Sequence, residues 1–269
     1  MTATAIQCPA PEDDETDAGD DRAGTPSVTK ALQLLEVFRG AESVLGVSTI
    51  ARLAGIPKST AHRLLVYLER GGYVEREGRG YVLGRRLFEL GNAVMMCRPS
   101  GLREVAMPHL SRLYADHGKV VQLGVLDGSD VVYLEKIFGL TSVRTPTIVG
   151  GRMPATSTAL GKAMLAFSDR ETITRALEDG LARRTPYSLT DPGRFVAELR
   201  KARLEQVAYD REETQVGLVC AAAPILSNGR AVGAVSMSSL ATQVNLPAAG
   251  HDVRRAAAAI SHGLTSLGA

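Results

Sequence analysis

The sequence has few cysteines, no long hydrophobic run and no leader-like beginning. Cys8, Cys97 and Cys220 are widely spaced and odd in number, which fits neither a disulfide framework nor a metal site. No stretch approaches the roughly 20 uncharged apolar residues that a membrane span needs, and the N-terminus lacks the basic region and apolar core of a signal peptide. We therefore expect a cytoplasmic protein with no membrane segment, no metal and no cofactor.

Charges of opposite sign gather in different parts of the chain, although the net charge is only +2. Residues 1–26 hold seven acidic side chains, one basic side chain and few large apolar ones, so we expect this segment to be disordered. Residues 27–98 hold eleven basic and six acidic side chains. Such an excess fits a module that binds a polyanion, although many basic surfaces merely face solvent.

Three helices are expected between residues 27 and 71. The first begins at a Ser27 N-cap, the second at a Ser48 N-cap and the third near Pro57, where Gly55-Ile56-Pro57 breaks the chain. Apolar residues at helical spacing give each helix one inward face: Ala31, Leu34, Leu35 and Phe38; Ile50, Leu53 and Ala54; Ala61, Leu64, Leu65 and Leu68. Two β-rich runs, 73–76 and 80–83, then predict a hairpin. Short helices that meet at a glycine-containing turn and precede a hairpin are typical of a winged helix-turn-helix.

The outer face of the third helix and the tip of the hairpin are polar and basic. A recognition helix needs such a face to enter the major groove, and a wing needs cations to meet phosphates or the minor groove. The predicted DNA-contacting residues are Lys58, Ser59, Thr60, His62 and Arg63 on the helix, with Arg76 and Arg79 on the wing. A three-helix bundle with a charged surface would show the same pattern.

The rest of the chain predicts a linker helix and an α+β domain with an antiparallel sheet. Residues 85–97 have an apolar side, as a helix between two domains would. Hairpins are expected around Asp127-Gly128 and Ser227-Asn228-Gly229, and a further strand at 143–149. Helices are expected after Pro99 up to Gly118, and at 157–167, 169–178, 192–205 and 249–266. Thr156 or Ser157 is expected to cap the 157–167 helix, whose small first turn (Ala159, Gly161) would let an anionic ligand approach its free amides.

Several stretches resemble the isocitrate lyase regulator (IclR) family of bacterial regulators. They are "LAGIPKSTAHRLLVYLERGGYV", "GGRMPATSTALGKAMLA", "YDREETQVGLVCAAAPI" and "AVGAVSMSSL", and the similarity covers all but the acidic tail. The resemblance implies a winged helix-turn-helix at 27–84, a linker and dimerisation helix at 85–98, and a GAF-like effector-binding domain at 99–269. It also implies a homodimer or a dimer of dimers on a palindromic operator of double-stranded DNA, with binding modulated by a small-molecule effector.

The same resemblance places the effector pocket at the start of the 157–167 helix. It implies roles for Ala159, Leu160, Asp210, Cys220, Ser236 and Ser238. Leu160 and Met153 would make the pocket more apolar, which favours an aromatic or aliphatic acid over a very small one. A charged Asp210 would repel such an acid, unless Asp210 accepts from a ligand hydroxyl or is itself protonated. Each of these residues also has a purely structural interpretation, as a core cysteine or a capping acid.

Two other functions fit parts of the sequence less well. Cys220 could serve as an enzyme nucleophile, but none of the five histidines lies in a catalytic signature, and "ALGKA" lacks the leading glycine and the ending of a phosphate loop. A winged helix can also act as a protein-interaction scaffold. The polar, cationic outer face expected for the third helix and the hairpin argues against that function, because a protein-binding face would be more apolar.

Overall fold

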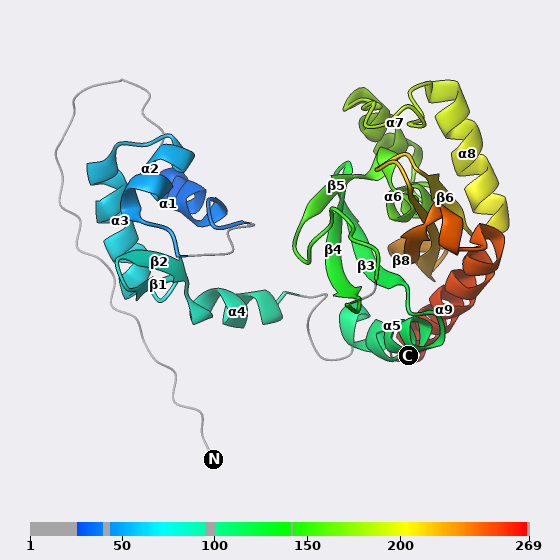
Figure 1. Ribbon diagram of the computed structural model, residues 1–269, viewed down its shortest axis with the longest axis horizontal. Coiled ribbons are helices and arrows are strands. Elements are labelled where there is room, and N and C mark those ends of the chain that lie inside the picture. Colours follow the sequence, from blue (N-terminus) through cyan, green and yellow to red (C-terminus); the bar gives the residue numbers. More distant parts are fainter. Residues whose placement is uncertain (1–25, 40–43, 95–100, 141, 268–269) are drawn as a thin grey trace, which may run out of the picture. The chain divides into compact units, whose positions relative to one another are not determined.

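The computed structural model describes residues 26–39, 44–94, 101–140 and 142–267. It forms two compact units, residues 1–86 and 87–269 (Figure 1). The expected disordered tail lies outside the described residues except for Pro26, and so does the 95–98 part of the expected linker helix.

The described residues of the first unit form three helices and a two-stranded sheet before the linker helix begins. These are α1 (Ser27–Glu36), α2 (Val47–Ala54), α3 (Lys58–Arg70), β1 (Val74–Glu77) and β2 (Gly80–Leu83). The two strands are antiparallel, with Glu77 opposite Gly80, so Gly78-Arg79 forms the turn, and Gly78 has the positive φ that such a tight turn needs. Leu34, Ile50, Ala61, Leu65 and Val74 meet in a core that holds the three helices and the wing together.

The helix starts differ from the sequence-based expectation. Ser27 is the first residue of α1 and Pro26 is its N-cap, while α2 begins one residue before Ser48, after Gly46. Because Val47 belongs to α2, the inward face is Val47, Ile50, Ala51 and Ala54, at i, i+3, i+4 and i+7. The expectation that Leu53 faces inward is wrong, since its side chain is 53% exposed and Ala51 is buried in its place.

The linker helix is shorter than expected over the described residues. Helix α4 spans Arg85–Asn92, and Ala93 and Val94 have left the helix. No residue of α4 is buried, and Phe88 is 76% exposed. Leu90 and Val94, at 45% and 46% exposed, leave two further apolar side chains of this segment in solvent.

The second unit is built on a six-stranded antiparallel sheet in the order β5-β4-β3-β8-β7-β6. The strands are β3 (Val120–Asp127), β4 (Asp130–Ile137), β5 (Arg152–Pro154), β6 (Ala208–Arg211), β7 (Leu218–Ser227) and β8 (Arg230–Leu240). Both expected hairpins, β3–β4 and β7–β8, are present. The expected strand at 143–149 is not, whereas the short strands β5 and β6 were missed.

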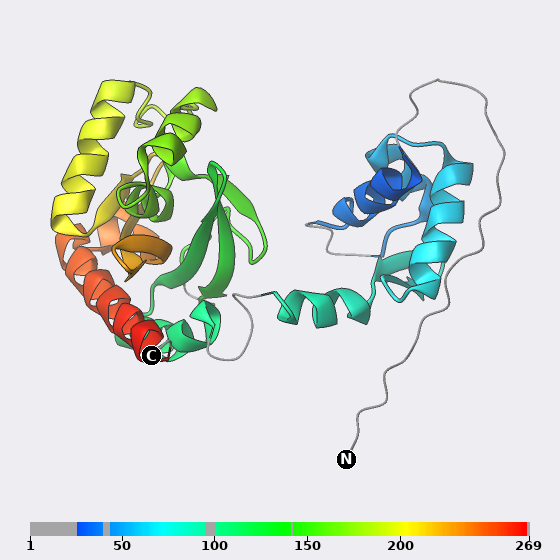
Figure 2. The same cartoon turned by 180° about the vertical axis from the view of Figure 1, so that it is seen from behind.

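Helices cover both faces of this sheet (Figures 1 and 2). Helices α5 (Leu102–His117) and α9 (Leu246–Leu267) pack on one face, and α6 (Ala159–Leu165), α7 (Arg170–Glu178) and α8 (Pro192–Glu205) on the other. Strand β7 shows the alternation that this needs, because Ala221 and Ala223 face the α5–α9 core while Cys220 and Ala222 face the α6 side.

Helix α6 is held close to the sheet and to the preceding turn. Its N-cap is Thr158, whose hydroxyl accepts a hydrogen bond from the Gly161 amide at 3.0 Å, so the expected cap at Thr156 or Ser157 is wrong. Those two residues lie in a 3-10 turn, Ala155–Ser157. A Cβ atom on Gly161 would lie 2.1 Å from the Ala155 carbonyl oxygen, so only glycine permits this approach.

Candidate DNA-binding surface and effector pocket

The outer face of α3 is polar and exposed to solvent. Lys58, Ser59, His62 and Arg63 are exposed and Thr60 is half-buried, because the opposite face of the helix is committed to the core. Within the described residues, the side chains of Lys58, Ser59, His62 and Arg63 make no hydrogen bond or ion pair. Their donors and charges are therefore available to another molecule.

Tyr67 extends this face by one further turn of α3. It lies four residues after Arg63, and its side chain is 61% exposed. Sequence reasoning missed Tyr67 because an aromatic residue in an amphipathic helix is ordinarily assigned to the core.

The two wing arginines have different surroundings. Arg76 donates a hydrogen bond to the Tyr81 hydroxyl at 2.9 Å, and its Nε lies 3.6 Å from Glu69 Oε2 on α3. Arg79 lies in the exposed turn of the hairpin and makes no such contact with another described residue. Arg76 thus ties the wing to α3, whereas Arg79 presents its charge to solvent.

A polar row crosses three strands on the α6 side of the second unit. Asp210 on β6 pairs with Cys220 on β7, which pairs with Ser238 on β8. A small cavity lies against this row. Six of the seven residues predicted for the effector line it: Ala159, Leu160, Asp210, Cys220, Ser236 and Ser238.

Met153 does not line this cavity. It lies on β5 opposite Val131, and its side chain is buried in the apolar cluster between the sheet and α6. The prediction that Met153 makes the pocket apolar therefore does not fit this cavity, because its side chain packs in the core.

The structure adds cavity residues that the sequence did not reveal. They are Gln122, Tyr133, Thr145, Pro146, Thr147, Thr158, Thr214 and Leu218. The Gln122 amide donates to the Thr147 hydroxyl, and Lys136 Nζ donates to the Thr147 carbonyl oxygen at 2.6 Å. Residues 145–147 therefore line the cavity and are held there by hydrogen bonds from Gln122 and Lys136. No local sequence pattern predicts these contacts.

The cavity is small as it stands. Its volume is about 20 Å³, which suffices for about one water molecule. An organic molecule can therefore enter only if a wall moves outward. One of these walls is the 145–147 segment, which is held by hydrogen bonds from Gln122 and Lys136 to Thr147.

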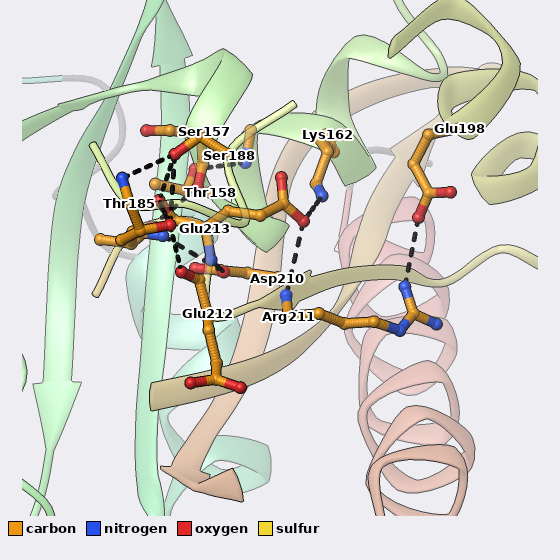
Figure 3. A network of polar contacts seen from close by, with 12 residues as sticks. Ser157, Thr158, Lys162, Thr185, Ser188, Glu198, Asp210, Arg211, Glu212 and Glu213 are labelled. Carbon is orange, nitrogen blue, oxygen red and sulfur yellow. Dashed lines mark hydrogen bonds and ion pairs between the residues drawn. The ribbon is translucent and has the colours of Figure 1, made fainter. Parts of the chain in front are cut away.

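Behind the cavity lies a buried network of charged groups (Figure 3). Lys162 Nζ donates to Glu213 Oε1 at 2.5 Å, and Asp210 Oδ1 accepts from the amides of Glu213 and Thr214 at 2.7 and 3.4 Å. Burial raises the pKa of the Asp210 carboxyl against the effect of the Thr214 hydroxyl beside it and the attraction of Lys162. Burial also raises the pKa of Glu213, again opposed by Lys162.

Cys220 has the surroundings of a structural thiol. Its sulfur donates to the Ser238 hydroxyl at 3.0 Å. Burial raises the pKa of the Cys220 thiol far above its usual range. A thiol that stays protonated is a poor nucleophile, and no histidine lines the described cavity to act as its base.

Comparisons with known proteins match both units. The family model of the IclR helix-turn-helix domain matches residues 27–78, and that of the bacterial transcriptional regulator IclR C-terminal domain matches residues 96–262. The HTH-type transcriptional regulator XynR of Escherichia coli is 33% identical over 223 residues, which are 81% of this chain and 88% of that protein. The transcriptional repressor IclR of Escherichia coli is 30% identical over 209 residues, which are 76% of each chain.

A solved structure supports the same assignment. The crystal structure of an IclR homolog from Microbacterium hydrocarbonoxydans, complexed with 4-hydroxybenzoate, is 28% identical with a TM-score of 0.82 and covers 90% of this chain and 100% of that one. No helix among the described residues is long and apolar enough to cross a membrane. Since the two family models follow one another along the chain and together span most of it, the chain belongs to the IclR family and is a DNA-binding transcriptional regulator, not an enzyme.

Proposed function

We propose that this regulator binds a palindromic operator through α3 and the wing, and that an organic acid in the α6 cavity modulates the binding. The exposed, unpartnered side chains of α3 carry this proposal. Lys58, Ser59, Thr60, His62 and Arg63 approach base edges and nearby phosphates, and Arg79 approaches the phosphates flanking the wing. Arg76 acts mainly by holding the wing in place.

Pairing of two chains would supply the second recognition helix that a palindrome requires. The exposed apolar side chains of α4 and its C-terminal end, Phe88, Leu90 and Val94, support a homodimer or a dimer of dimers that buries them. Two α3 helices held by a two-fold axis would meet half-sites about one turn of DNA apart. Such a complex forms where the chromosome is, in the bacterial cytoplasm.

The effector is proposed to be an aromatic or aliphatic organic acid. The cavity offers apolar walls, Leu160 and Leu218, beside hydroxyl and amide groups such as Ser236 and Gln122. The 4-hydroxybenzoate bound by the homolog supports this class. The acid changes operator binding only to the extent that it binds two conformations of the regulator with different affinity.

The test is selection of genomic fragments by the purified protein and by a Lys58→Ala/Arg63→Ala variant. Each fragment is then measured by fluorescence anisotropy at fixed salt, with and without 4-hydroxybenzoate. We expect the wild type to enrich a few short palindromes. Arg63→Ala alone should cost about 1–3 kcal/mol on these sites if Arg63 reads a guanine. An exposed arginine on α8 gives the matched control, Arg200→Ala, which should bind like the wild type.

Two outcomes would count against the proposal. Equal losses on operator and random DNA would make Arg63 a phosphate contact and not a reader of bases. If the wild type enriches nothing, with or without the acid, α3 does not read DNA, and the winged helix is then a scaffold for protein partners.

A further inference from the structure

Two buried carboxyl groups share one buried cation behind the cavity. Lys162, Asp210 and Glu213 are 0%, 1% and 5% exposed. Lys162 reaches from α6 to Glu213, with 2.5 Å between Nζ and Oε1 (Figure 3). The Lys162 ammonium group donates directly to the Glu213 carboxylate, so the two side chains together form an ion pair with no net charge. Asp210 therefore has no cation in contact with it within the described part of the chain.

The hydrogen bonds of Asp210 fit a neutral carboxylic acid. The amides of Glu213 and Thr214 both donate to the same atom, Oδ1, and the Thr214 hydroxyl beside the carboxyl donates its own proton to the Ser157 carbonyl oxygen at 2.7 Å. A protonated acid has this asymmetry, since its carbonyl oxygen accepts and its hydroxyl is left to donate. An isolated carboxylate buried at this depth is costly, and such groups usually take up a proton.

The other groups around Asp210 do not supply the missing charge. Cys220 lies opposite it on β7, and Tyr133 lines the same cavity from β4; burial raises the pKa of both, so both are neutral. On β6 itself, the neighbouring Arg211 turns its guanidinium toward Glu198 on α8, 3.5 Å away (Figure 3). Among the described residues, Lys162 is thus the cation whose charge acts on Asp210, and that charge is already paired with the Glu213 carboxylate.

We propose that Asp210 keeps a proton at neutral pH and offers its hydroxyl to the carboxylate of the effector, and that the Lys162–Glu213 pair makes this possible by cancelling its own charge. An ionised Asp210 would repel an anionic ligand. A protonated Asp210 attracts it by a charge-assisted hydrogen bond. Asp210 thereby selects for acids, and Lys162 and Glu213 are positioning residues that act through it.

The first test uses the empty protein, so that it does not depend on the proposed function on which this inference rests. Infrared difference spectra compare the wild type with Asp210→Asn, in which an amide of the same shape replaces the acid. We expect the carbonyl band of a protonated carboxyl in the wild type at neutral pH and its loss in the variant. If no such band distinguishes the two, Asp210 is ionised and the proposal fails.

Glu213→Gln provides a second variant in case Asp210→Asn does not fold. Removing the Glu213 charge frees Lys162 to stabilise an ionised Asp210, so the carboxyl band should disappear at neutral pH. Persistence of the band would overturn the role given to the Lys162–Glu213 pair. The matched control, Glu198→Gln, changes a carboxylate that contacts Arg211 on the surface, and it should leave the band unchanged.

The pH dependence of folding stability tests independently whether the pKa of Asp210 is raised in the folded state. An acid whose pKa is higher in the folded state than in the unfolded chain destabilises the fold as pH rises between the two values. In that window, the unfolding equilibrium constant of the wild type should increase relative to Asp210→Asn by up to about tenfold per pH unit. A ratio that is independent of pH, or that changes in the opposite direction, would contradict a protonated Asp210.

The ligand test uses 4-hydroxybenzoate and isothermal titration. Asp210→Asn, still neutral and still a donor, should bind within a few-fold of the wild type at neutral pH, while the affinity of the wild type should fall at high pH. A large loss in the variant at neutral pH would show that a charged Asp210 is needed. If neither protein binds the acid while the infrared band is present, the effector class is wrong and the protonation of Asp210 stands.

Discussion

Single side chains in the wing have separable roles because their contacts differ. Arg79→Ala removes a charge that contacts no other described side chain, so it should leave stability unchanged. It should weaken binding to operator and random DNA alike and reduce the slope of affinity against salt by about one. Anisotropy titrations at several salt concentrations measure both effects. An unchanged slope would remove Arg79 from the DNA interface.

Arg76→Ala is the matched comparison for Arg79→Ala. It removes the hydrogen bond to Tyr81 and the approach to Glu69. Net loss of one such bond is worth about 0.5–1.5 kcal/mol, so the first unit should unfold at a lower temperature. A variant as stable as the wild type, with the full salt effect, would instead make Arg76 a phosphate contact.

Residues that interact across long separations mark the limit of sequence reasoning at this scale. The polar row could be located because Asp210, Cys220, Ser236 and Ser238 lie in motifs that resemble a family. The ion pair of Lys162 and Glu213 could not be found, because 51 residues separate its members and the resemblance gave neither of them a role, although both lie in stretches that carry it. Their burial depends on how α6 docks on the sheet, which only tertiary structure decides.

At the scale of elements, periodicity predicted long helices well and short strands poorly. Helix α8 has the expected bounds, since a proline and a capping aspartate fix its start. Strands β5 and β6 have three and four residues, too few for an alternation to be visible. The 143–149 run is rich in β-branched residues, yet Thr145 and Thr147 bond to each other and Thr147 to Gln122 in place of a neighbouring strand.

The packing of α6 gives a prediction at the element scale. Gly161→Ala would place a Cβ atom against the Ala155 backbone, so α6 must move away from the 155–157 turn. Overpacking of this kind costs about 1–3 kcal/mol, and the displacement carries Ala159 and Leu160 out of the cavity wall. Calorimetry should show a less stable second unit, and titration should show weaker effector binding.

Gly91→Ala is the control for this substitution. Gly91 lies in α4, and a Cβ there would meet no other atom within 4 Å. Alanine in an open helical position stabilises by about 0.5–1 kcal/mol relative to glycine. If both variants behave alike, close packing of α6 does not explain the need for Gly161.

At the scale of the whole molecule, two compact units must act together although their own cores are separate. The winged helix has the charge and shape to meet DNA, and the second unit holds the cavity. A signal between them needs a chain segment whose arrangement the effector can bias. Helix α4 joins the two units in sequence and leaves apolar side chains in solvent, so it is the element on which assembly is proposed to depend.

Phe88→Asp tests that dependence. A charge in place of the exposed aromatic side chain of α4 should oppose burial of this helix against a second copy and shift the protein to a smaller assembly in sedimentation equilibrium. Affinity for the full palindrome should then fall toward that for a single half-site, because each α3 binds alone. The control Leu204→Asp, at an apolar position of α8 that is 86% exposed, should change neither property. A Phe88→Asp protein with the mass and operator affinity of the wild type would place the dimer contacts outside α4. A loss of operator affinity without a change in mass would instead mean that α4 aligns the DNA-binding units without joining them.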